Sequence, residues 1–178
     1  VYDSGVRLPA SYANFLITNG SVIVPTYRCD KDEVALDIIQ ECLKYKVPLS
    51  QHDLLKIVCE LKIQNFRGVF MRDVLPQYSK NIECGILNLD LIKGSGTHWT
   101  CWIKQSENLC YYFDSFGVNP PIEFEKYVKC DILYSTYQIQ KMEEVICGHL
   151  CLLVLYGAVK LKLNFHSVVQ KLFFLYNK

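Results

Sequence analysis

Within 50 residues, three side chains have the chemistry that thiolate nucleophilic catalysis requires. Cys147 is followed by Gly148 at the start of a long apolar segment, and His98 and Asp114 precede them. A thiol at a helix N-terminus is favoured as the thiolate, because the free N–H groups and the macrodipole stabilise negative charge. A protonated His98 would favour it further. Asp114 would fix the orientation of that imidazole, as in the Ser-His-Asp template.

An oxyanion donor is available from either of two glutamines upstream of the cysteine. Gln138 and Gln140 fall on the same side of an alternating segment, so the pattern leaves the choice between them open. A carboxamide N–H and a backbone N–H at the helix start would together stabilise a tetrahedral oxyanion. One such donor contributes about 10²–10³ in rate.

Two alternating segments, 97–103 and 109–114, predict a β-hairpin. If its turn is centred on Ser106, residues whose numbers sum to 212 face each other, and His98 opposes Asp114. Opposed Cβ atoms lie about 4.5–5.5 Å apart, which would let the carboxylate accept the imidazole Nδ1–H. The same alternation predicts a core-facing side formed by Trp99, Cys101, Ile103, Leu109, Tyr111 and Phe113.

The other histidines fit structural roles better than catalytic ones. His52 falls in the first turn of a predicted helix, where a solvated side chain is expected. His149 is two residues from Cys147, and that spacing points helical side chains apart, so a packing or hydrogen-bonding role is predicted. His166 is predicted to be a cap or surface group of the last helix. Cys151, one turn after Cys147, is predicted to be a small core residue.

The remaining pattern predicts the elements that must position these side chains. Ser50 begins a capping box, and Pro121 suits the first turn of a helix. The expected helices are 31–45, 50–61, a short one after Pro121, a buried one over 147–163 and a last one over 166–176. Buried or alternating strands are expected at 84–89 and 131–140 in addition to the hairpin.

The composition limits the classes of protein to which this chain can belong. The 178 residues are 51% apolar, which predicts one compact domain, with an N-terminal arm and helices over 1–62 and a catalytic core over 63–178. The net charge of +1 lacks a nucleic-acid signature. Nine cysteines with no metal-ligand spacing, and an N-terminus that is not basic then apolar, predict reduced thiols in an intracellular protein. No apolar stretch is long enough to cross a bilayer.

Several short motifs, in order and spacing, resemble the adenain family of adenovirus maturation proteases. They are Gly68–Pro76, Gly96-Thr97-His98-Trp99, Tyr112–Gly117, Gln138-Ile139-Gln140, and Cys147-Gly148 with Cys151. The likeness covers about residues 65 to 160. Adenain has Glu at the position of Asp114, and in having Asp there this chain resembles the SUMO proteases of the same clan.

The resemblance implies an α+β fold in which a central mixed sheet packs on a buried helix that carries the nucleophile at its N-terminus. It implies a cysteine endopeptidase that cleaves after small, Gly-Gly-like residues in a narrow cleft. It favours Gln140 over Gln138 as the oxyanion donor. The roles it implies are His98 as base, Asp114 as orienting acid, Cys147 as nucleophile, and Trp99 and Gly148 as substrate-binding residues.

The resemblance also bears on partners and cofactors. It implies capsid or core precursor proteins as substrates, in the virion or the host nucleus or cytoplasm, for an adenovirus-related virus or a Polinton-like element. It implies no metal or cofactor. It leaves open an activating peptide linked through Cys130, which is one residue out of the family's register. Stimulation by DNA and contact with a membrane are not expected.

Three other functions fit the same residues. A deconjugating peptidase for a ubiquitin-like modifier such as SUMO would need a broad docking surface for a folded partner. Acyl transfer to Lys, Ser or Thr uses the same constellation. A binding module that keeps the fold without catalysis is the third, although it would be free to lose the site residues.

Overall fold

The computed structural model describes residues 2–3, 6–7, 16–18, 21–23 and 48–176. The chain divides into two compact units, Val1–Tyr45 and Lys46–Lys178. Two antiparallel pairs are described in the first unit: β1 (Tyr2–Asp3) with β2 (Val6–Arg7), and β3 (Leu16–Thr18) with β4 (Ser21–Ile23). The helix predicted over 31–45 lies outside the described residues.

Helix α2 (Gln51–Leu61) begins where the capping box predicts. The Ser50 hydroxyl accepts the backbone N–H of Asp53 at 3.2 Å, and the Asp53 carboxylate accepts the N–H of Ser50 at 2.9 Å. Two N–H groups that a helix end otherwise leaves unpaired are thereby satisfied. The buried face consists of Leu54, Val58 and Leu61, whereas His52 is exposed, as expected.

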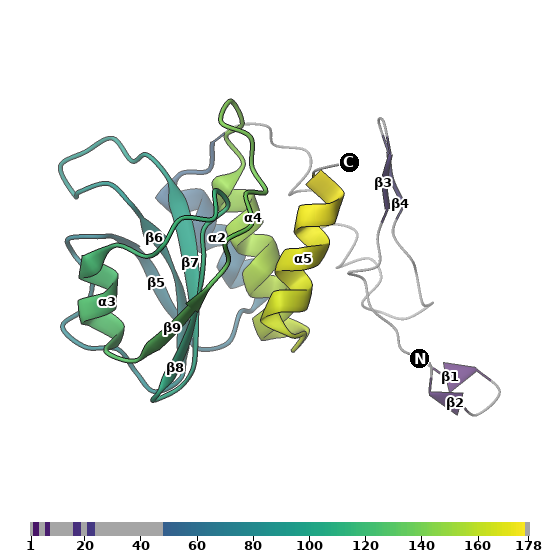
Figure 1. Cartoon of the computed structure of the whole chain (residues 1–178), viewed down its shortest axis with the longest axis horizontal. Coiled ribbons are helices and arrows are strands. Elements are labelled where there is room, and N and C mark those ends of the chain that lie inside the picture. The colour runs from purple at the N-terminus through teal and green to yellow at the C-terminus, as the bar shows by residue number, and fades with distance from the viewer. Residues whose placement is uncertain (1, 4–5, 8–15, 19–20, 24–47, 177–178) are drawn as a thin grey trace. The chain divides into compact units, whose positions relative to one another are not determined.

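A five-stranded mixed sheet forms the centre of the second unit (Figure 1). In sheet order its strands are β5 (Phe66–Met71), β6 (Glu83–Asn88), β7 (Trp99–Ser106), β8 (Leu109–Phe113) and β9 (Asp131–Tyr134). The two outer pairings are parallel and the two inner ones antiparallel. The predicted central mixed sheet is confirmed, and the predicted buried strand is β6, all of whose residues are buried.

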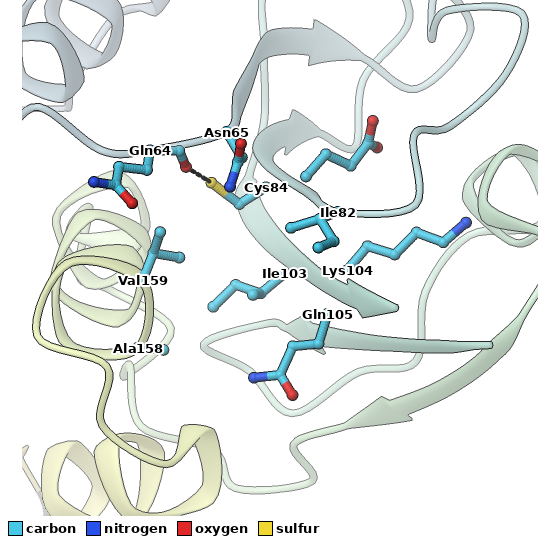
Figure 2. Close-up of a pocket in the computed structure, with 10 residues that line it drawn as sticks. Gln64, Asn65, Ile82, Cys84, Ile103, Lys104, Gln105, Ala158 and Val159 are labelled. Atoms are coloured by element: carbon cyan, nitrogen blue, oxygen red, sulfur yellow. Dashed lines mark hydrogen bonds between the residues drawn. The ribbon is translucent and has the colours of Figure 1, made fainter. Parts of the chain in front are cut away.

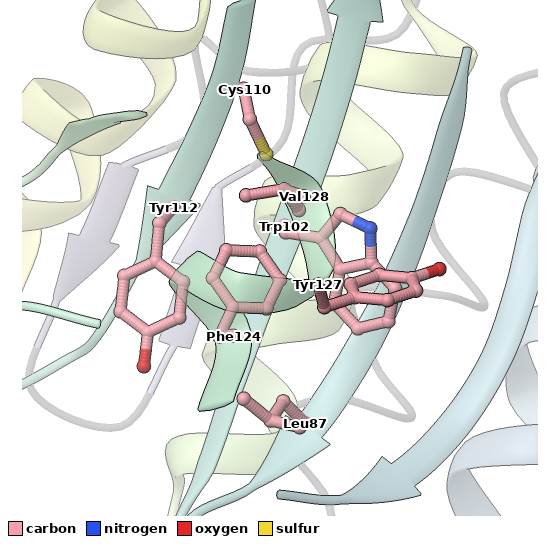
Figure 3. Packing of buried hydrophobic residues seen from close by; sticks show 7 residues of the cluster. All are labelled: Leu87, Trp102, Cys110, Tyr112, Phe124, Tyr127 and Val128. Carbon is pink, nitrogen blue, oxygen red and sulfur yellow. The ribbon is translucent and has the colours of Figure 1, made fainter. Parts of the chain in front are cut away.

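Helices cover both faces of this sheet. On one face α3 (Ile122–Val128) packs on an aromatic cluster of Leu87, Trp102, Cys110, Tyr112, Phe124, Tyr127 and Val128 (Figure 3). On the other face α4 (Cys147–Leu155) packs against β7, and the Cys101 thiol donates to the Cys151 carbonyl at 3.7 Å. The hairpin therefore buries both of its sides, not only the side with Trp99 and Cys101 that the alternation indicated.

The hairpin register differs from the predicted one. Cys101 pairs with Phe113 and Trp102 with Tyr112, so paired numbers sum to 214 and the turn is centred one residue later than Ser106. The register shifts again between residues 104 and 106. Because moving the centre by one residue moves each partner by two, every side chain keeps its face. His98 and Asp114, just outside the paired strands, become diagonal rather than directly opposed neighbours.

The C-terminal third departs from prediction in two places. The strand expected over 131–140 ends at Tyr134, because residues 135–140 cross to the turn after β8 instead of continuing along it. The helix expected over 147–163 ends as α4 at Leu155 and continues as a π-helical turn η2 (Tyr156–Lys160). The last helix, expected over 166–176, is α5 (Phe165–Tyr176). No helix within the described residues is both long and apolar enough to span a membrane.

Candidate active site

A cleft of about 720 Å³ opens where the N-terminus of α4 meets the start of β7. Four of the predicted site residues line it: His98, Trp99, Gln140 and Cys147. These residues come from the loop before β7, from β7 itself, from the segment after β9 and from the first residue of α4. The other two, Asp114 and Gly148, are buried behind its wall.

The imidazole of His98 is held by Asp114. The distance from His98 Nε2 to Asp114 Oδ1 is 3.1 Å, and the carboxylate side chain is 1% exposed. The same oxygen accepts the backbone N–H of Phe116 at 2.7 Å, and the Phe116 ring lies 4.7 Å from the imidazole. The expectation that Nδ1 meets the carboxylate is wrong: because the pair is diagonal, the carboxylate reaches the far nitrogen, Nε2.

The loop before His98 is tied down by two side chains that the sequence reasoning missed. The Asn88 carboxamide oxygen accepts the backbone N–H groups of Asp90 and Thr97, at 2.9 and 3.1 Å. The Asp90 carboxylate accepts the N–H of Gly96 at 3.0 Å. Asn and Asp at and just after the end of a buried strand are a signal for such local hydrogen bonding, and could have identified them.

Cys147 is the first residue of α4 and is 9% exposed. Burial raises the pKa of its thiol, but hydrogen bonds from His98 and from the backbone N–H groups of Trp99 and Gly148 outweigh that effect, so the pKa is lowered. Burial likewise lowers the pKa of His98, but its hydrogen bonds to Asp114 and Cys147 raise it to about 9. Both shifts favour a thiolate–imidazolium pair at neutral pH.

Gln140 rather than Gln138 lies in the cleft. Gln138 is exposed, whereas Gln140 is 2% exposed and lines the cavity with Cys147. The Gln140 Nε2 donates to the Glu144 carbonyl, and its Oε1 accepts the Ser115 hydroxyl at 2.9 Å. The choice that the alternating pattern left open is thus decided by which glutamine the chain buries.

The wall beside Cys147 is rigid. The Trp99 indole N–H donates to the Leu49 carbonyl at 2.9 Å, which holds the ring in one orientation. A Cβ atom on Gly148 would lie 3.3 Å from atoms of Leu49, Leu54 and Trp99, closer than most packed Cβ contacts. Gly148 therefore lets α4 approach this wall, and does not itself line the cleft.

The other thiols and histidines have different surroundings. Burial raises the pKa of Cys110, Cys130 and Cys151, and raises that of Cys84 to about 12. His149 is buried, and neither ring nitrogen has a hydrogen-bond partner in the part of the chain that the structure describes. The exposed His166 packs edge-on against Tyr111. Within residues 48–176, no three His, Cys, Asp or Glu side chains gather as metal ligands would.

A smaller cavity of about 320 Å³ lies at the opposite ends of β6 and β7 (Figure 2). Its lining is mainly apolar, with Ile103 and Val159, and the Cys84 thiol in it donates to the Gln64 carbonyl at 3.5 Å. Burial raises the pKa of this thiol to about 12, which favours the protonated form at neutral pH, in contrast to Cys147.

Comparison with solved structures gives the class of fold. The fold of this chain is similar to that of a solved protease. The crystal structure of the ASFV pS273R protease aligns with a TM-score of 0.53 over 72% of this chain and 66% of that one. The sequences are 14% identical over the alignment, so the likeness is one of fold. The narrower adenain and Polinton assignments stay predictions.

The N-terminal segment is similar to a different class of protein. Residues 1–62 match the family of Porphyromonas-type peptidyl-arginine deiminases. Curated relatives named as agmatine deiminases are 52% identical over 41 residues in Vibrio parahaemolyticus serotype O3:K6 (strain RIMD 2210633) and 57% identical over 37 residues in Marinomonas sp. (strain MWYL1). These alignments cover 23% and 21% of this chain. The chain spans about a tenth of the relatives' length, 11% and 10%. No motif in the sequence analysis pointed to this likeness.

Proposed function

We propose that the second unit is a cysteine endopeptidase. The observation that carries this proposal is the chain of contacts from Asp114 through His98 to Cys147, which ends at a buried thiol on a helix N-terminus inside a 720 Å³ cleft. A thiol whose pKa is lowered by an imidazole is the activated nucleophile of thiol proteases. The likeness to a protease fold is independent support.

In the proposed reaction the Cys147 thiolate attacks the carbonyl carbon of the scissile peptide bond, and the carbonyl π electrons move to the oxygen. The His98 imidazolium then donates its proton to the leaving amine as the C–N bond breaks, which leaves a thioester. Neutral His98 next takes a proton from water. The resulting hydroxide attacks the thioester carbonyl carbon, and the C–S bond then breaks with its electron pair returning to sulfur, which releases the acid product and restores the Cys147 thiolate beside the His98 imidazolium. Both tetrahedral intermediates carry an oxyanion.

Two donors are proposed for that oxyanion. One is the carboxamide N–H of Gln140, which lines the cleft, and the other is a backbone N–H at the start of α4. Preorganised donors of this kind stabilise charge as it develops, without reorganisation during the reaction. Asp114 keeps the imidazole aligned through Nε2, so that Nδ1 is the nitrogen left for Cys147.

We further propose that the peptide segment before the scissile bond carries small residues, as in precursor proteins with Gly-Gly-like sites. The fixed Trp99 indole lines the cleft next to the thiol and limits the room for a large side chain there. The deiminase-like segment covers about a tenth of its relatives, and we assign it no activity.

Intact-mass labelling tests the proposal with two probes that carry the same electrophile. One is a short peptide ending in Gly-Gly and the other is a folded ubiquitin-like protein. Labelling of the wild type by the short peptide, lost in Cys147→Ala and kept in Cys151→Ala, is the expected result. Labelling by the folded protein alone would replace the proposal with a deconjugating peptidase, and labelling that persists in Cys147→Ala would refute the assigned nucleophile.

A further inference from the structure

Ser115 lies at the junction between the acid and the oxyanion donor of the proposed site, although it does not line the cleft. It follows Asp114 in a turn closed by Gly117, whose N–H donates to the Asp114 carbonyl at 3.0 Å. Gly117 has a φ of +74°, and a Cβ there would lie 2.6 Å from the Thr136 carbonyl oxygen. The turn is therefore packed tightly on the segment that leads to Gln140.

Three hydrogen bonds join Ser115 to that segment. Its carbonyl accepts the backbone N–H groups of Ile139 and Gln140, at 2.8 and 3.0 Å. Its hydroxyl donates to the side-chain oxygen Oε1 of Gln140 at 2.9 Å. Ser115 is fully buried and Gln140 is 2% exposed, so water does not compete for these bonds.

Two side-chain hydrogen bonds hold the Gln140 carboxamide, one at each end. A glutamine amide has nearly the same shape in its two flipped orientations, and only its hydrogen-bond partners distinguish them. Ser115 donates to Oε1, and the Glu144 carbonyl accepts from Nε2. The Glu144 carbonyl can only accept, so it selects this orientation, and the Ser115 hydroxyl holds the Oε1 end of the carboxamide in place. In that orientation, the second N–H of Nε2 is left for a ligand in the cleft.

We infer that Ser115 is a positioning residue, which holds the Gln140 carboxamide in place so that its second N–H meets the oxyanion. The inference rests on the proposed protease function. Because Asp114 and Ser115 are consecutive, one short turn aligns both the acid and the oxyanion donor.

The test compares two reactions of the same thiol. Acylation by the p-nitrophenyl ester of a short peptide ending in Gly-Gly builds an oxyanion, whereas alkylation by iodoacetamide displaces iodide at a saturated carbon and builds none. In Ser115→Ala we expect kcat for the ester to fall about 10-fold or more with KM nearly unchanged, since losing one oxyanion donor costs about 10²–10³. The iodoacetamide rate at Cys147 should stay within about twofold.

A double-mutant cycle tests whether Ser115 affects kcat through Gln140. If Ser115 acts through Gln140, the double variant with Gln140→Ala should be no slower than Gln140→Ala alone. Ser115→Cys keeps a weaker donor of similar size and should have an intermediate kcat. This second variant still tests the inference if Ser115→Ala fails to fold. Unchanged kcat in Ser115→Ala, or effects that multiply in the double variant, would overturn this inference alone. A wild type that is alkylated at Cys147 but never acylated would overturn the proposed function with it.

Discussion

Removing the imidazole of His98 should raise the pH at which Cys147 becomes reactive. In the intact site, burial raises the pKa of the thiol, and the hydrogen bond from His98 is the largest of the contributions that lower it below the ordinary value. Without His98 the burial effect remains, so the thiol pKa should move above the ordinary value. An opposite charge in contact shifts a pKa by about 1–3 units, so we expect the reactive midpoint to rise by about 2 pH units or more.

The size of the effect on rate follows from the thiolate fraction. Below both midpoints that fraction falls tenfold for each unit by which the pKa rises, so His98→Ala should be alkylated about 100-fold more slowly at pH 6. The wild type should keep its reactivity until acid protonates the thiolate. The two profiles should converge only at a pH above the raised thiol pKa of His98→Ala.

The assay is the rate of iodoacetamide addition from pH 5 to 10, followed by intact mass and located by peptide mapping. Cys147→Ser defines the background from the other thiols. His52→Ala is a matched control, because His52 is exposed on α2 and does not line the cleft. Superimposable profiles for wild type and His98→Ala would refute the assigned pair.

Three further predictions concern stability and turnover. Asp114→Asn should lower kcat strongly and cost stability at low pH. Asp114 and Cys147 together raise the His98 pKa from 6.5 to about 9, which corresponds to about 3 kcal/mol in all, fully present below pH 6.5 and lost as the pH rises through about 9, and the variant should lose the part that is due to Asp114. Melting curves of both proteins at pH 6 and pH 9.5 check this, and an equal difference at both values would contradict it. Gly117→Ala should lower the free energy of unfolding by more than about 1 kcal/mol, as measured by urea denaturation. The substitution places a Cβ 2.6 Å from the Thr136 carbonyl oxygen, at a residue whose φ is positive. Leu87→Ala, in the fully buried aromatic cluster, should cost about 2–5 kcal/mol in the same assay, and a loss below 1 kcal/mol would mean that the cluster tolerates the cavity.

Elements with local signals were predictable from the sequence. The capping box at Ser50 starts α2 because its hydrogen bonds join residues three apart, and β6 is visible as a short apolar run. The hairpin was found, but its turn was placed one residue early. Alternation identifies faces without counting how many residues the turn takes, so His98 and Asp114 were brought together with the wrong imidazole nitrogen.

Residues that act through contacts distant in the chain were not predictable. The hydrogen bond from Ser115 to Gln140 joins positions 25 residues apart, and neither residue type by itself indicates that the bond forms. The carboxamide of Asn88 organises the His98 loop only because β6 and β7 pair in one register. The deiminase-like stretch at 1–62 carries no motif that residue patterns reveal.

The sequence by itself determined the inventory of the candidate site, since a thiol, an imidazole, a carboxylate and a carboxamide in this order are a matter of residue type and spacing. It also determined the elements that carry them, because capping and periodicity are local. Only the tertiary structure decided which glutamine enters the cleft and which nitrogen of His98 meets Asp114. Those choices depend on strand register, on the crossing of residues 135–140 over the turn after β8, and on burial, which are set by packing between segments distant in the chain.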